Sequence, residues 1–186
     1  MKKLYVTNEI PTDAAILLVD VQKEFFDESF AHQEDEHINV LEKRIETRLQ
    51  IMKNKLTELK TKGHPILAVG GDSIYEGFEL LPNVILPNWN YDYVQPKEDF
   101  DTGGGFVMDP AIVEEVGKYK DVIVCGLWKE LCVYMVSRSL QKVYGDKVKL
   151  FTDESLTLEN ALVWLDDDVL TLEGVCENDK VEIIND

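Results

Sequence analysis

Cysteine is scarce in this chain, with only Cys125, Cys132 and Cys176 among 186 residues. Three cysteines without regular spacing do not indicate a disulfide framework, so we expect a reducing, cytoplasmic setting. Long apolar runs are also lacking, and no stretch approaches the roughly 20 residues needed to cross a bilayer. The lysines Lys2 and Lys3 are not followed by an apolar run. We therefore expect neither a signal peptide nor a membrane partner.

Basic residues and histidines are also few. The chain has 19 Lys and Arg against 36 Asp and Glu, a formal net charge of -17. Phosphate backbones require clustered Lys and Arg, so we expect no nucleic-acid partner, and the acidity is typical of a soluble protein. The histidines His32, His37 and His64 lack the spacing of a zinc site. We expect no metal and no cofactor.

Apolar runs of strand length alternate with segments of helical pattern. This alternation predicts an α/β fold, a three-layer α-β-α sandwich with a central parallel sheet of Rossmann-like type. The length fits one domain over residues 1–186. We interpret residues 1–13 as an irregular leader. The expected strands cover residues 14–19, 65–69, 93–95, 122–125, 148–151 and 181–184.

Four helices are expected between these strands. Apolar residues spaced three and four apart predict a long amphipathic helix that ends before Gly63, namely Ile38, Leu41, Ile45, Leu49, Met52, Leu56 and Leu59. A second helix starts at Asp109-Pro110, with Asp as cap and Pro at the first position. The other two span residues 133–144 and 158–165, and residues 74–92 are typical of a long loop.

An acid and a thiol follow two of the expected strands. Asp20 ends the apolar run that begins at Ala14, and Cys132 follows the strand over residues 122–125, at the start of a helix. Groups just past the carboxyl ends of parallel strands share one crevice, so we expect the two to meet. Lys97, after residues 93–95, could join them. A buried carboxylate is costly unless it is paired or functional, which favours a functional interpretation of Asp20.

The position of Cys132 predicts a reactive thiol. Free N–H groups at a helix N-terminus favour a thiolate and can also hold an oxyanion. Glu130 acts in the opposite direction, because a nearby negative charge raises the pKa of a thiol. We expect Cys132 to have the lowest pKa of the three thiols, with Cys125 as a core residue and Cys176 without a role.

The flanking residues complete a recognisable pattern. Residues 16–25 (ILLVDVQKEF) contain an Asp-x-Gln-x-x-Phe signature, and residues 124–133 (VCGLWKELCV) contain a strand, a Gly, a turn and Cys-Val. Pro96-Lys97 lies between them, and a Gly, a strand and an Asp follow over residues 145–153. In this order the chain, over roughly residues 14 to 165, resembles the isochorismatase-like cysteine hydrolases, which include the nicotinamidases.

The resemblance implies a role for each residue. Cys132 would be the nucleophile, Asp20 the base, and Lys97 the cation that stabilises both charges. The backbone N–H groups of Trp128 and Cys132 would form an oxyanion hole, and Phe25 and Trp128 would contact the substrate. A cis peptide bond, usual in this turn of the family, would fall at Leu127-Trp128.

The sequence also departs from the family. Nicotinamidases carry a metal-binding Asp-x-His after the second strand, and here the segment is Asp72-Ser73-Ile74. The leading hypothesis is therefore a metal-independent cysteine hydrolase that cleaves a small amide or related carbonyl C–N bond through a covalent acyl-enzyme, acting as a homo-oligomer. The alternative is a catalytically silent member that serves as a binding or assembly module. A flavodoxin-like binding domain is a third hypothesis, but Gly103-Gly104-Gly105 lacks the spacing of a phosphate-binding loop.

Overall fold

A seven-stranded sheet organises the structure, a computed structural model of the chain that describes residues 2–21, 35–69, 93–94, 107–108, 110–150, 155–158 and 181–185. The sheet has the order β3-β2-β6-β7-β1-β9, and β8 also pairs with β6. All of these pairings are parallel. The strands are β1 (Lys2–Val6), β2 (Ala15–Val19), β3 (Ile66–Val69), β6 (Val122–Leu127), β7 (Val148–Leu150), β8 (Thr157–Leu158) and β9 (Val181–Asn185).

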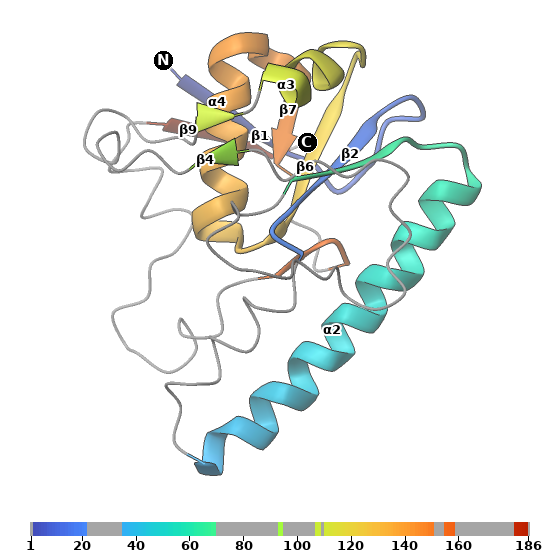
Figure 1. Cartoon of the computed structure of the whole chain (residues 1–186), viewed down its shortest axis with the longest axis vertical. Helices are drawn as coiled ribbons and strands as arrows, with labels where there is room; N and C mark the ends of the chain where they lie inside the picture. Colours follow the sequence, from blue (N-terminus) through green and yellow to red (C-terminus); the bar gives the residue numbers. More distant parts are fainter. Residues whose placement is uncertain are drawn as a thin grey trace.

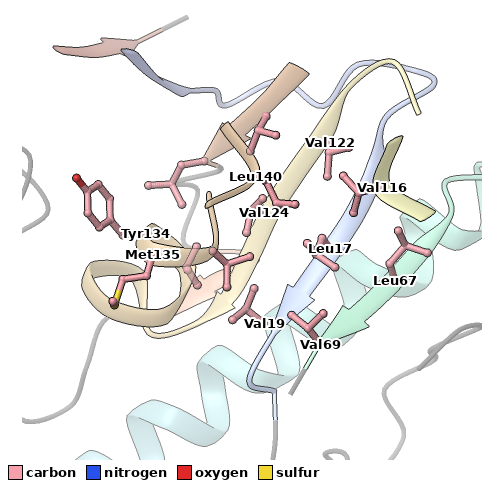
Figure 2. Close-up of a cluster of buried hydrophobic side chains, with 14 of the residues drawn as sticks. Leu17, Val19, Leu67, Val69, Val116, Val122, Val124, Tyr134, Met135 and Leu140 are labelled. Atoms are coloured by element: carbon pink, nitrogen blue, oxygen red, sulfur yellow. The ribbon is translucent and has the colours of Figure 1, made fainter. Parts of the chain in front are cut away.

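The central strands are buried on both faces because their side chains alternate between two hydrophobic cores. Leu17 and Val19 of β2 belong to one core, and Ile16 and Leu18 belong to the other. The same alternation occurs in β3 and β6, and Figure 2 shows the side chains of the first core projecting from these strands. Continuous apolar runs such as AILLV are expected of strands covered on both faces. Each fully buried Leu or Val stabilises the fold by about 1.5–3 kcal/mol.

Helices cover the two faces of the sheet. The long helix α2 (Asp35–Thr61) buries Met52, Leu56 and Leu59 in the core that contains Ile16. The helices α3 (Pro110–Gly117) and α4 (Tyr134–Tyr144) contribute to the opposite core, through residues that include Val116, Val136 and Leu140. Figure 1 shows α2 apart from α3 and α4, which lie together. The three layers confirm the predicted α-β-α sandwich. No helix within the described ranges has the length and apolar character needed to span a bilayer.

Most predicted elements are confirmed, and three predictions are wrong. Residues 1–13 are not an irregular leader, because β1 lies between β7 and β9 with Leu4 fully buried. The strand near residues 93–95 exists as β4 (Tyr93–Val94), but it pairs antiparallel with β5 (Val107–Met108) in a separate two-stranded sheet. Leu158, predicted to start a helix, lies in strand β8. The rest of that helix, and the loop over residues 74–92, fall outside the described residues.

Candidate active site

Asp20 lies at the carboxyl end of β2, in the centre of the sheet. Its side chain is 1% exposed, and its backbone N–H donates to the carbonyl oxygen of Val69 at 3.0 Å. Its φ angle is 52°, a left-handed conformation that Asp and Asn adopt more readily than most residues. The turn in the chain after Val19 therefore places a carboxylate at the buried edge of the sheet.

Gly126 brings the end of β6 unusually close to β2. It has a φ angle of 120°, and a Cβ atom at this position would lie 2.2 Å from the carbonyl oxygen of Val19 and 2.7 Å from its nitrogen. Only a glycine fits such an approach of two backbones. Gly126 is part of the motif over residues 124–133, in which no role was predicted for it. A glycine inside an apolar strand was the available signal for this close contact.

Cys132 lies in a turn of π-helix, Lys129–Val133, between β6 and α4. The peptide bond Leu127-Trp128 is cis, at the position that the family resemblance implied. The carbonyl oxygen of Trp128 accepts hydrogen bonds from the N–H groups of Leu131 and Val133, both at 3.1 Å. Isolated π-helical turns occur often at functional sites. Here the turn places the backbone N–H groups of Trp128 and Cys132 near the sulfur of Cys132, where they lower the pKa of its thiol.

The carboxylate of Asp20 lies near enough to the thiol of Cys132 to act on its pKa, so the structure brings the two predicted residues together. The pKa of the Cys132 thiol is raised well above its usual range. Burial is the largest cause, and the negative charge of Asp20 is the next. The two backbone N–H groups lower the pKa but do not outweigh these effects. The prediction of a low-pKa thiol is therefore wrong in direction, because burial and the charge of Asp20 both favour the protonated thiol.

We predict that iodoacetamide alkylates Cys132 more slowly at pH 7 than it alkylates a free cysteine of pKa about 8.5. A raised pKa leaves a smaller thiolate fraction, so the rate should climb only in alkaline solution. Replacing Asp20 by Asn removes one cause of the raised thiol pKa, so labelling of Cys132 near pH 7 should become faster. Mass spectrometry of the labelled peptide measures both rates. Labelling of wild-type Cys132 that is already maximal at pH 7 would contradict this assignment.

The other predicted site residues have different outcomes. Trp128 is 6% exposed and belongs to the core that also contains Leu158, while its contact with a substrate remains a prediction. Lys97 and Phe25 lie outside the described residues. The expectation that Lys97 follows a strand of the parallel sheet is wrong, because β4 is not part of that sheet. Its assignment now depends on the Pro96-Lys97 motif alone.

Cys125 is a core residue, as expected. It is fully buried, its thiol donates to the carbonyl oxygen of Leu17 at 3.7 Å, and burial raises its pKa. Cys176 and the segment Asp72-Ser73-Ile74 lie outside the described residues. Among the residues that the structure does describe, no group of three His, Cys, Asp or Glu side chains is arranged to hold a metal ion.

Comparisons with known proteins support the fold. No family model matches the chain, and no curated protein matches it. Among solved structures, an isochorismatase from Pseudomonas putida KT2440 is similar over 95% of this chain and 92% of that chain, with 16% identity and a TM-score of 0.51. This similarity shows that the chain has the isochorismatase-like α/β fold.

Two further structures are similar at lower scores. YcaC from Pseudomonas aeruginosa, solved with hexane-2,5-diol and covalent acrylamide, matches 94% of this chain and 76% of its own, with 16% identity and a TM-score of 0.47. YcaC from Escherichia coli is described as an octameric hydrolase of unknown specificity. It matches the same shares of the two chains, with 18% identity and a TM-score of 0.46.

Proposed function

We propose that this protein is a hydrolase that uses Cys132 to cleave a small amide or a related carbonyl C–N bond, without a metal ion. One observation carries the proposal: the buried carboxylate of Asp20 lies beside the thiol of Cys132. A nucleophile beside a base is the general signature of covalent catalysis. The isochorismatase-like fold supports the same conclusion. Asp20 and Cys132 lie in the two segments of this chain that resemble the sequence signatures of the cysteine hydrolases.

The first step transfers the thiol proton to Asp20 while the sulfur attacks the carbonyl carbon of the substrate. The C–N bond then breaks, and the leaving amine takes the proton back from Asp20, which leaves a thioester on Cys132. In the second step Asp20 accepts a proton from water, and the hydroxide attacks the thioester. The carboxylic acid product departs, and the sulfur regains its proton. Both steps use Asp20 in the roles expected of a general base and general acid.

The backbone N–H groups of Trp128 and Cys132 would serve as the oxyanion hole. In the resting structure both lie near the sulfur of Cys132 and lower the pKa of its thiol. As the sulfur attacks, negative charge develops on the carbonyl oxygen of the substrate, and the same donors can stabilise it there. Donors fixed before the reaction are worth about 2.7–4 kcal/mol each in comparable sites. Lys97 would add a positive charge beside Asp20 and Cys132, a role that rests on the family resemblance.

A screen of small amides combined with intact-protein mass spectrometry tests the proposal. We predict that a substrate found in the screen adds the mass of its acyl group to the wild-type chain during turnover, with the label on the peptide that contains Cys132. Cys125→Ala should keep the adduct, because Cys125 is a core residue, whereas Cys132→Ala should lose it. An active protein that never carries the acyl group would contradict covalent catalysis. Failure of every amide to react would instead favour the non-catalytic binding or assembly module.

A further inference from the structure

A cavity lies at the opposite end of the sheet from Asp20 and Cys132. Its volume is about 580 Å³, within the usual range for small-molecule sites. His64, in its lining, contacts the carbonyl oxygen of Ala14, which directly precedes β2, whereas Asp20 directly follows the strand. Figure 1 shows the loop between β1 and β2 beside the C-terminal end of α2, where this cavity is formed. The proposed hydrolase chemistry does not use any of its residues.

The cavity has two walls, and each wall contains an apolar side chain together with charged side chains. The loop after β1 contributes Ile10 and Glu9, and the end of α2 contributes Leu59 together with the lysines Lys55 and Lys62. Ile10 and Leu59 both belong to the core on the α2 side of the sheet, so the apolar part of each wall is anchored. The loop wall is fixed as well, because the hydroxyl of Thr7 accepts from the N–H of Glu9 at 3.2 Å and donates to its carbonyl oxygen at 2.8 Å.

The charges on the two walls are of opposite sign. Lys55 and Lys62 both form ion pairs with Glu58, which leaves one excess positive charge on the helix wall. The loop wall carries the single negative charge of Glu9. A ligand that complements both walls needs an anionic group and a cationic group, with an apolar part between Ile10 and Leu59.

His64 adds a hydrogen-bond acceptor to the lining. Its side chain is 7% exposed, and its Nδ1 atom lies 2.9 Å from the carbonyl oxygen of Ala14. A carbonyl oxygen only accepts, so Nδ1 carries a proton, and in the tautomer protonated at Nδ1 alone the Nε2 atom is an acceptor. Within the described part of the chain no hydrogen bond to Nε2 is present. In that tautomer Nε2 can accept a hydrogen bond from a donor on a ligand in the cavity.

We infer that this cavity binds a small zwitterionic α-amino acid with an apolar side chain. Its carboxylate would lie against Lys55 and Lys62, and its ammonium would donate to Glu9 and to Nε2 of His64. Its apolar side chain would contact Ile10 and Leu59. The site is distinct from the proposed catalytic centre. β2 connects the two, because His64 contacts Ala14 directly before the strand and Asp20 directly follows it.

Binding of L-leucine to the full chain tests the inference, with chemical-shift mapping by NMR and two modified probes. N-acetyl-L-leucine lacks the ammonium charge, and L-leucinamide lacks the carboxylate. We predict that leucine shifts the amide signals of residues 8–10, 12 and 55–64, with a Kd of about 1 mM. Each modified probe should bind about fivefold more weakly, as expected for the loss of a partly exposed ion pair.

Charge variants assign the two ends of the ligand. Glu9→Gln should weaken leucine binding about two- to fivefold and remove the preference for leucine over N-acetyl-leucine, while Lys62→Met should remove the preference over leucinamide. Glu46→Gln and Lys43→Met, exposed on α2 outside the cavity, are the matched controls and should bind as the wild type does. The inference is overturned if leucine shifts no signal in the two segments, if the three probes bind equally, or if the controls weaken binding as much as the cavity variants. None of these readouts depends on hydrolase activity.

Discussion

Replacing Asp20 by Asn should leave a folded protein whose turnover is about 10²–10⁴-fold lower than that of the wild type. The amide cannot accept the proton of Cys132, so the proposed attack loses its base. Folding should be little affected, because Asn tolerates the left-handed backbone conformation at this position nearly as well as Asp does. The comparison requires kcat/KM on a substrate from the amide screen, together with circular dichroism of both proteins.

The variant Asp13→Asn makes the same chemical change at an exposed loop position and should retain full activity. Alkylation separates loss of the base from damage to the site. In Asp20→Asn the Cys132 thiol should react faster near pH 7 while turnover falls, because the negative charge that raises its pKa is gone. Near-wild-type turnover in a folded Asp20→Asn protein would reject Asp20 as the base and favour the non-catalytic module.

Gly126→Ala should be the most destabilising single substitution among those considered. The added methyl group would overlap the carbonyl oxygen of Val19, and the φ angle of 120° is one that alanine rarely adopts. Backbone strain of about 1–3 kcal/mol and overpacking of about 1–3 kcal/mol both apply. We therefore expect the free energy of unfolding to fall by about 3 kcal/mol or more, a large part of the 5–15 kcal/mol typical of a domain.

Gly145→Ala is the matched control for this substitution. Gly145 also has a positive φ angle, 60°, but nothing lies within 4 Å of a Cβ atom there. With a ψ angle of -130°, Gly145 has a conformation that other residues rarely adopt, so its variant should lose about 1–3 kcal/mol from backbone strain alone. Urea unfolding of the two variants measures the difference. If both lose the same free energy, the close approach of β6 to β2 contributes nothing beyond backbone strain.

The buried centre of the fold could be predicted from sequence because each central strand is a continuous apolar run. β2, β3 and β6 are fully buried along their length, and all three were located by this pattern. β1 was missed because its five residues begin with two lysines and give no such run. Its place in the sheet depends on β7 and β9, which lie more than 140 residues further along the chain. A local pattern carries no information about such partners.

The meeting of Asp20 and Cys132 was predictable for a similar reason, since both follow buried parallel strands. The state of the thiol was not predictable, because it depends on how deeply the folded chain buries the sulfur and on which charge faces it. The π-helical turn escaped prediction as well. Residues 129–133 (KELCV) are compatible with an ordinary helix, and the register of the turn is set by the carbonyl oxygen of Trp128. Local propensity does not distinguish the two.

The position of β1 has a consequence for the order in which this protein folds. β1 pairs with β7 on one side and β9 on the other, in the registers Tyr5 with Lys149 and Lys2 with Val181. Contacts of such sequence separation form late, since closing a long loop costs entropy before any contact repays it. On the ribosome the β2-β3-β6 centre can assemble while β1 still lacks both neighbours. β1 emerges before the other strands of the sheet but is among the last to join it, and until then its backbone N–H and C=O groups are open to chaperones or to other nascent chains.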